Sequence, residues 1–183
     1  THYPDGTTIP NYTNNSQWAN LANNNTDDAY CIYNNNANSE KDIYGALYTW
    51  SASMGDNAVS SNSVPSGVQG VCPDGWHIPS DEEWQILEMF VGMSSSQADA
   101  VGWRGTDQGS QLSADKLLWV NDVLVFDPTF EDSGFDALPG GNRNGTVGNG
   151  SSVNLREAAK FWTSTEIGGD AWSRVIKYDN IRV

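Results

Sequence analysis

The chain is poor in basic side chains. Nine Lys and Arg stand against 23 Asp and Glu, which leaves a net charge of -14 over 183 residues. Such a charge repels phosphate backbones and anionic lipid headgroups, so it argues against nucleic-acid partners and electrostatic docking to membranes. No run approaches the roughly 20 apolar residues of a membrane-spanning helix, so no membrane insertion is predicted.

Histidine is equally scarce. With only His2 and His77 present, a Ser/His/Asp arrangement has one realistic base, and His77 inside GWHIP is interpreted as structural. The carboxylates at 81–83 are explained by the start of a helix, without a glycosidase role. The sequence therefore predicts a protein that is not an enzyme.

Cys31 and Cys72 are the only cysteines, too few for a zinc site built on thiolates. One prediction is a disulfide between them, which would close a loop of about 40 residues. The alternative is two buried free thiols. Nineteen Asn and nineteen Ser describe a surface solvated by amides and hydroxyls. Together with a first segment, THYPDGTT, that has neither a basic nor an apolar region, this predicts a mature, secreted, extracellular protein.

Secondary-structure signals are few. Ser80 and Glu83 form a capping-box pattern that predicts a helix over 81–91, with Trp84 on its apolar face. A weaker helix is predicted within 94–102, and a strand or short turn within 116–126. FWTSTE and AWSRVIKYD alternate as strands do. The composition predicts an α+β fold with few helices, a small antiparallel sheet and long irregular loops.

Several long motifs occur in a fixed order: YPDGTTIPN, YGALYTWSA, CPDGWHIPSDEEWQIL, SGFDALPGGNR and FWTSTE. In these the chain resembles the Fibrobacter succinogenes major paralogous domain family of secreted bacterial modules. The resemblance implies a C-type-lectin-like fold, related to that of formylglycine-generating enzymes, in a single domain over 1–183. It also implies that the family's first and last strands are missing, so an open sheet edge is expected to be completed by further chain or by a partner.

An acidic segment, DPTFEDSGFD, suggests calcium, because Ca²⁺ takes oxygen ligands from carboxylates, amides and main-chain carbonyls. The alternative is a solvated acidic turn. The candidate ligands are Asp127, Glu131, Asp132 and Asp136.

Aromatic rings, Arg and Asn gather in the second half of the chain, where they suggest a binding face. The alternative is that the rings fill a glycine-rich core and that Arg143 ties local carbonyls. The favoured function is an adhesin-like module that binds glycan or protein through these loops, and the alternative is a structural subunit of a surface assembly or filament, bound to copies of itself. The candidate ligand-binding residues are Trp103, Asn142, Arg143, Asn144, Trp162, Trp172 and Tyr178.

Overall fold

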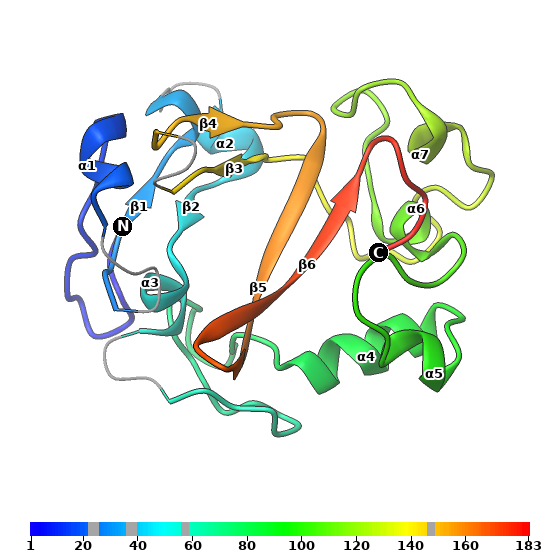
Figure 1. Ribbon diagram of the computed structural model, residues 1–183, viewed down its shortest axis with the longest axis horizontal. Helices are drawn as coiled ribbons and strands as arrows, with labels where there is room; N and C mark the ends of the chain where they lie inside the picture. The colour runs from blue at the N-terminus through cyan, green and yellow to red at the C-terminus, as the bar shows by residue number, and fades with distance from the viewer. Residues whose placement is uncertain (22–25, 36–39, 56–58, 146–148) are drawn as a thin grey trace. The chain divides into compact units, whose positions relative to one another are not determined.

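The computed structural model describes residues 1–21, 26–35, 40–55, 59–145 and 149–183 (Figure 1). Its described part is an α+β arrangement of short helices and three two-stranded sheets, which confirms the predicted fold class. The chain divides into two compact units, each described by itself. The first comprises Thr1–Glu83, Arg143–Val153 and Trp162–Ser173, and the second comprises Trp84–Asn142, Asn154–Phe161 and Arg174–Val183.

The first unit is built from very short elements. Side chains cap two of its helices, since Asn14 accepts hydrogen bonds from the main chain at the start of α1 and Thr49 does so at the start of α3. β1 and β2 pair antiparallel, with Tyr30 opposite Tyr48. The elements are α1 (Asn15–Ala19), β1 (Tyr30–Cys31), η1 (Tyr33–Asn35), α2 (Glu40–Tyr44), β2 (Leu47–Tyr48) and α3 (Trp50–Met54).

Three small apolar clusters, rather than one large core, hold the first unit together. One is formed by Tyr3, Ile9 and Ala52, and the others centre on Trp18 and on Trp50. Hydrogen bonds from two indoles link distant segments: Trp50 Nε1 donates to the Thr163 carbonyl at 2.7 Å, and Trp162 Nε1 donates to the Tyr48 carbonyl at 3.0 Å.

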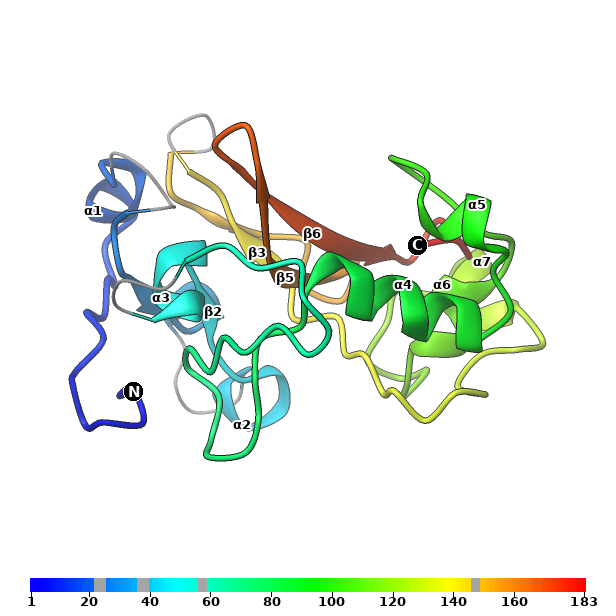
Figure 2. The ribbon, with the colours of Figure 1, turned by 90° about the horizontal axis from the view of Figure 1, so that it is seen from below.

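The second unit has the largest core. Leu112, Trp119, Leu124 and Ile176 are all almost completely buried in it. In Figure 2, α4 leads directly into α5. The helices are α4 (Asp81–Phe90), whose first turn belongs to the first unit, α5 (Ser95–Ala98), α6 (Gln108–Leu112) and α7 (Val123–Phe126).

The predicted helix over 81–91 is confirmed as α4, with the predicted cap. The Ser80 N–H donates to Glu83 Oε2 at 2.9 Å, and the Glu83 N–H donates to Ser80 Oγ at 3.2 Å. α5 begins after a second capping box, Ser94 with Gln97, inside the predicted segment 94–102 but ends earlier, at Ala98. In the segment 116–126 the predicted alternative of a turn is present, followed by α7, and no strand forms there.

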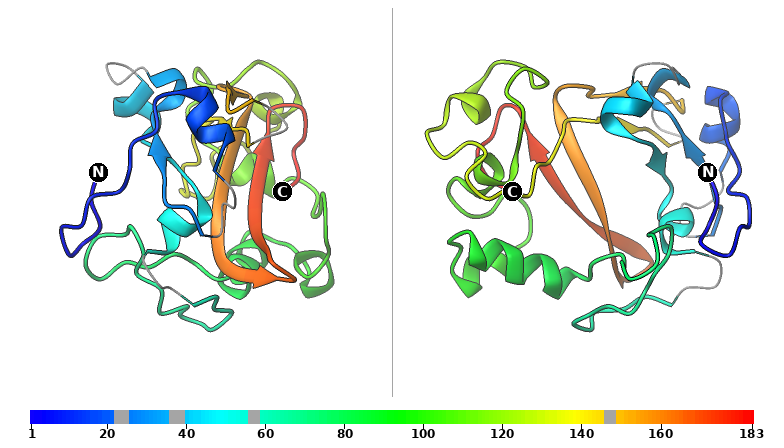
Figure 3. Two further views of the ribbon diagram at one scale, coloured as in Figure 1. Left: turned by 60° about the vertical axis from the view of Figure 1, so that its left-hand side comes forward. Right: turned by 180° about the vertical axis from the view of Figure 1, so that it is seen from behind.

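Two strands were predicted near the end of the chain, and both are present. β5 (Ala158–Ile167) and β6 (Asp170–Lys177) form a long hairpin that is visible in both views of Figure 3. The remaining strands, β3 (Asn142–Arg143) and β4 (Ser152–Val153), pair with each other. No helix in the described ranges has the length and apolar character that crossing a bilayer requires.

The predicted disulfide is wrong in this structure, because Cys31 and Cys72 are both free thiols. Cys31 is fully buried against Trp18 and Ala29, whereas Cys72 packs at the edge of the Trp50 cluster. The two sulfur atoms are thus held by different sets of apolar side chains. Burial raises the pKa of both thiols, so neither is activated as a thiolate nucleophile.

Candidate functional site

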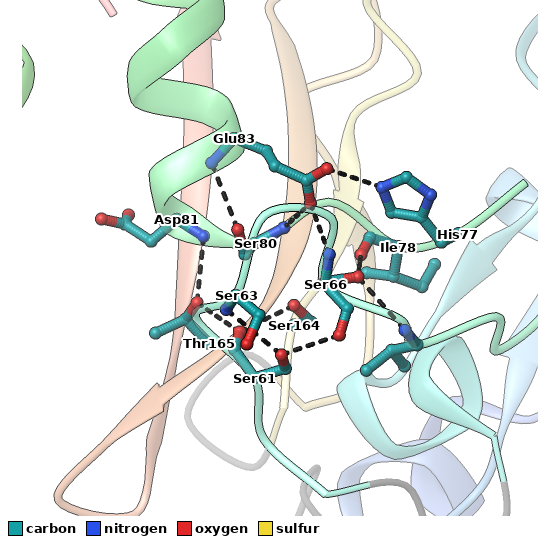
Figure 4. Close-up of polar contacts among 11 residues, drawn as sticks. Ser61, Ser63, Ser66, His77, Ile78, Ser80, Asp81, Glu83, Ser164 and Thr165 are labelled. Atoms are coloured by element: carbon teal, nitrogen blue, oxygen red, sulfur yellow. Dashed lines mark hydrogen bonds and ion pairs between the residues drawn. The ribbon is translucent and has the colours of Figure 1, made fainter.

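The turn before α4 carries a dense polar cluster (Figure 4). Its centre is Glu83, whose Oε1 lies 2.7 Å from His77 Nε2. Its other oxygen accepts hydrogen bonds from the N–H groups of Ser80 and Ser66, at 2.9 and 3.2 Å. Burial acts to raise the pKa of Glu83, but the two N–H donors and His77 outweigh it and lower that pKa. Glu83 is therefore held as a carboxylate that orients the imidazole.

The hydroxyl groups around Glu83 bind the main chain. Ser66 Oγ donates to the Ile78 carbonyl, and Ser164 Oγ and Thr165 Oγ1 both donate to the Ser61 carbonyl, at 2.9 and 2.8 Å (Figure 4). None of the hydroxyl groups drawn in Figure 4 has a hydrogen bond to His77. The cluster thus joins the segment around Ser61, the start of α4 and the tip of β5, and it lacks the nucleophile–base contact of a hydrolase site.

Next to His77, the side chain of Trp76 is 72% exposed. It ends a tight turn in which the Trp76 N–H donates to the Pro73 carbonyl at 3.0 Å, and Gly75 has a φ of +84°. Gln69 Nε2 fixes the same turn by donating to Asp74 Oδ1 at 3.1 Å. An indole exposed on an ordered turn is an unusual use of a large apolar side chain, and its neighbours in sequence, Asp74 and His77, are polar. Sequence reasoning missed Trp76, although the CPDGW turn signal was present.

Arg143, one of the predicted ligand-binding residues, uses its side chain inside the first unit. Its Nε donates to the Gly150 carbonyl at 2.7 Å, and Nη1 donates to the Tyr12 carbonyl at 2.8 Å. Nη2 donates to Asn15 Oδ1 at 3.0 Å, and the guanidinium carbon lies 4.9 Å from the centre of the Trp18 ring. Arg143 is thus a structural donor, as in the alternative interpretation, but only the Gly150 carbonyl is local, and its bonds to Tyr12 and Asn15 reach a distant segment.

The other predicted ligand-binding residues are divided between the units. Asn144, Trp162 and Trp172 lie in the first unit with Arg143, and Trp103, Asn142 and Tyr178 lie in the second. Trp162 and Tyr178 pack against apolar clusters, and Asn142 Oδ1 accepts a hydrogen bond from Asn154 at 2.8 Å. Among the four aromatic residues predicted to bind a ligand, Trp103 is exposed and the other three are partly buried.

The four acids proposed for calcium do not converge. Within the described ranges, no three His, Cys, Asp or Glu side chains lie close enough to hold a metal ion. Asp127 Oδ1 instead accepts hydrogen bonds from the N–H and the hydroxyl of Thr129, two residues later. Glu131 and Asp136 occupy left-handed backbone positions, with φ of +71° and +61°. Calcium binding stays a prediction.

A buried ion cluster that the sequence did not predict lies in the second unit. Glu88 of α4 is 0% exposed, and its carboxylate accepts hydrogen bonds from Arg104 and from Arg174. Trp84, one turn earlier, packs against Phe135 and Phe161 with ring centres 5.3 and 5.4 Å away. Glu88 falls on the predicted apolar face, four residues after Trp84, and this position was the available signal.

A protein-family model matches nearly the whole chain. The family model described as the Fibrobacter succinogenes major domain matches residues 1–182. The chain belongs to this family. The matched range includes the residues of the polar cluster, the Trp76 turn and the buried ion cluster. No curated protein and no solved structure matches the chain.

Proposed function

We propose that this Fibrobacter succinogenes major domain is a secreted, non-catalytic binding module, and that the turn carrying Trp76 contacts a neutral glycan. The observation that carries the proposal is the exposure of the Trp76 indole on a turn that hydrogen bonds hold in place. Because the turn is already ordered, binding costs little additional conformational entropy.

The chemistry around Trp76 suits a sugar. An indole offers a flat apolar face to the C–H face of a pyranose ring, and polar groups beside it can bind the ring hydroxyls. Asp74, Gln69 and His77 supply an acceptor, an amide and an imidazole in the same turn region. Sites for small ligands usually combine an apolar surface, such as this indole, with a small number of polar groups.

Charge argues for a neutral sugar. The sequence of the first unit holds twelve acidic and two basic side chains, a net charge of -10. Such a surface repels uronic and sialic acids and leaves uncharged hexose and pentose oligosaccharides as the favoured ligands.

The proposal extends to the fold and the setting of the module. Short helices, small sheets and long loops are compatible with membership of the C-type-lectin-like superfamily, and the Asn- and Ser-rich composition suits display outside a cell. The alternative is a structural subunit of an extracellular assembly. Such a subunit is expected to associate with itself in solution, whereas a binding module is expected to sediment as a monomer.

Calorimetric titration with a panel of neutral oligosaccharides tests the proposal. We expect at least one cello-, xylo- or manno-oligosaccharide to bind wild type, and Trp76→Ala to abolish that binding. Trp103→Ala, which removes an exposed indole from the second unit, is the matched control and should bind as wild type does. If Trp103→Ala alone removes binding, the ligand occupies the face predicted from the sequence. Absence of binding across the panel would contradict a glycan ligand.

A further inference from the structure

The outward face of α4 is apolar. Ile86 is 50% exposed, Phe90 is 83% exposed, and Met89 beside them is exposed as well. These positions are separated by three and four residues, so they form a continuous stripe along the helix. Phe90 ranks with the most exposed large apolar side chains of the described chain. We name Ile86, Met89 and Phe90 the outer stripe.

The opposite face of the helix holds the outer stripe in a fixed position. Glu88 is bound by Arg104 and Arg174, and Trp84 packs against two phenylalanine rings that also contact each other. The C-terminal end is closed by hydrogen bonds from the Gly92 and Met93 N–H groups to the carbonyls of Met89 and Glu88. The outer stripe therefore belongs to a rigid helix, and its exposure is not the result of a frayed end.

Charge indicates what kind of partner would cover the stripe. Glu82, exposed one turn before Ile86, carries a negative charge, and the last turn of α4 contains no basic residue. The sequence of the second unit adds eleven acidic and seven basic side chains, a net charge of -4. An apolar stripe on an acidic unit, on a helix with no basic residue in its last turn, matches an apolar segment flanked by Lys or Arg.

We propose that the outer stripe docks a basic amphipathic helix of another protein. Helices of this kind bind by placing apolar side chains, three and four residues apart, against an apolar surface. A second copy of this chain is disfavoured as the occupant because each copy has a charge of -14, and an anionic membrane is repelled for the same reason. The surface lies in the second unit and does not depend on the glycan proposal.

A model peptide tests the proposal with the full chain. The probe is a fluorescein-labelled helix of about 15 residues with Leu on one face and Lys on the other, and binding is followed by fluorescence anisotropy. We expect saturable binding by wild type and at least a tenfold weaker affinity in Ile86→Glu and Phe90→Glu. Both substitutions add negative charge, so a purely electrostatic interaction would become stronger. The same peptide with Glu in place of Lys should not bind.

Leu117→Glu is the matched control, because Leu117 is another highly exposed apolar residue of the second unit. It should keep wild-type affinity, and circular dichroism should show all three variants folded. The proposal is overturned if the peptide does not bind, or if Leu117→Glu weakens binding as much as Phe90→Glu does. It is also overturned if wild type sediments as a dimer that Phe90→Glu dissociates, since the occupant is then a second copy.

Discussion

Arg104 donates hydrogen bonds from two of its nitrogen atoms to the buried carboxylate of Glu88. Nη2 lies 2.8 Å from Oε1 and 3.0 Å from Oε2, and Nε lies 3.3 Å from Oε2. Arg174 Nε adds a further bond to Oε1 at 2.9 Å. One negative charge is thus shared by two positive charges within the interior of the second unit, where the forked geometry of arginine offsets part of the cost of leaving water.

Removing the carboxylate should destabilise the protein strongly. Glu88→Ala leaves two buried guanidinium groups without their acceptor, and we expect a loss of about 3 to 5 kcal/mol in the free energy of unfolding. Urea denaturation measures this loss. Glu82→Ala removes an exposed acid from the first turn of the same helix, where it accepts a hydrogen bond from Asn62, and should cost no more than about 1 kcal/mol. A similar small change for Glu88→Ala would show that water reaches the cluster.

Truncation of Trp84 should lower the free energy of unfolding as much as removal of Glu88 does. Trp84→Ala removes a buried ring that packs against Phe135 and Phe161, and we expect a cost of about 3 to 5 kcal/mol. Phe90→Ala serves as a control on the exposed face of α4 and should cost less than about 0.5 kcal/mol. Equal midpoints in thermal denaturation for Trp84→Ala and wild type would mean that the ring is not part of the core.

The sequence predicted α4 well because all of its signals are local. Ser80 and Glu83 are three residues apart, and the cap they form needs nothing from the rest of the chain. The outward position of Ile86 and Phe90 was not predicted, because helical spacing alone does not show which apolar side chains are covered. Which apolar side chains become buried depends on contacts that are distant in sequence.

Distance along the chain also explains which contacts of the predicted residues could not be foreseen. Arg143 looked available for a ligand, yet it bonds to the Tyr12 carbonyl, 131 residues away. Glu88 and Arg174 are 86 residues apart, and no local pattern pairs them. A disulfide was predicted because the chain has only two cysteines. The fold instead places Cys31 and Cys72 in separate apolar clusters.

The role of Arg143 can be measured by a conservative substitution. Arg143→Lys keeps the charge but cannot reproduce a planar fork that bonds two carbonyls and stacks on Trp18. We expect a loss of about 2 kcal/mol in urea denaturation. Arg182→Lys is the control, because the exposed Arg182 side chain donates to nearby Asn180 Oδ1, and it should be nearly neutral. A neutral Arg143→Lys combined with weaker glycan binding would assign Arg143 to the ligand instead.

Acid should weaken the polar cluster through Glu83. The folded state lowers the pKa of this carboxyl, so its contribution to stability is fully present above the unfolded value of about 4.3 and is lost as the pH falls through the lower, folded value. Glu83→Gln keeps a side-chain acceptor for the Ser80 N–H but cannot titrate. We therefore expect the thermal midpoint of the variant to change less than that of wild type between pH 6 and pH 3, and Glu82→Gln, which alters a neighbouring exposed acid, to follow wild type. If Glu83→Gln and wild type lose stability in parallel over this range, the acid sensitivity belongs to other carboxylates and Glu83 is not the titrating group of the cluster.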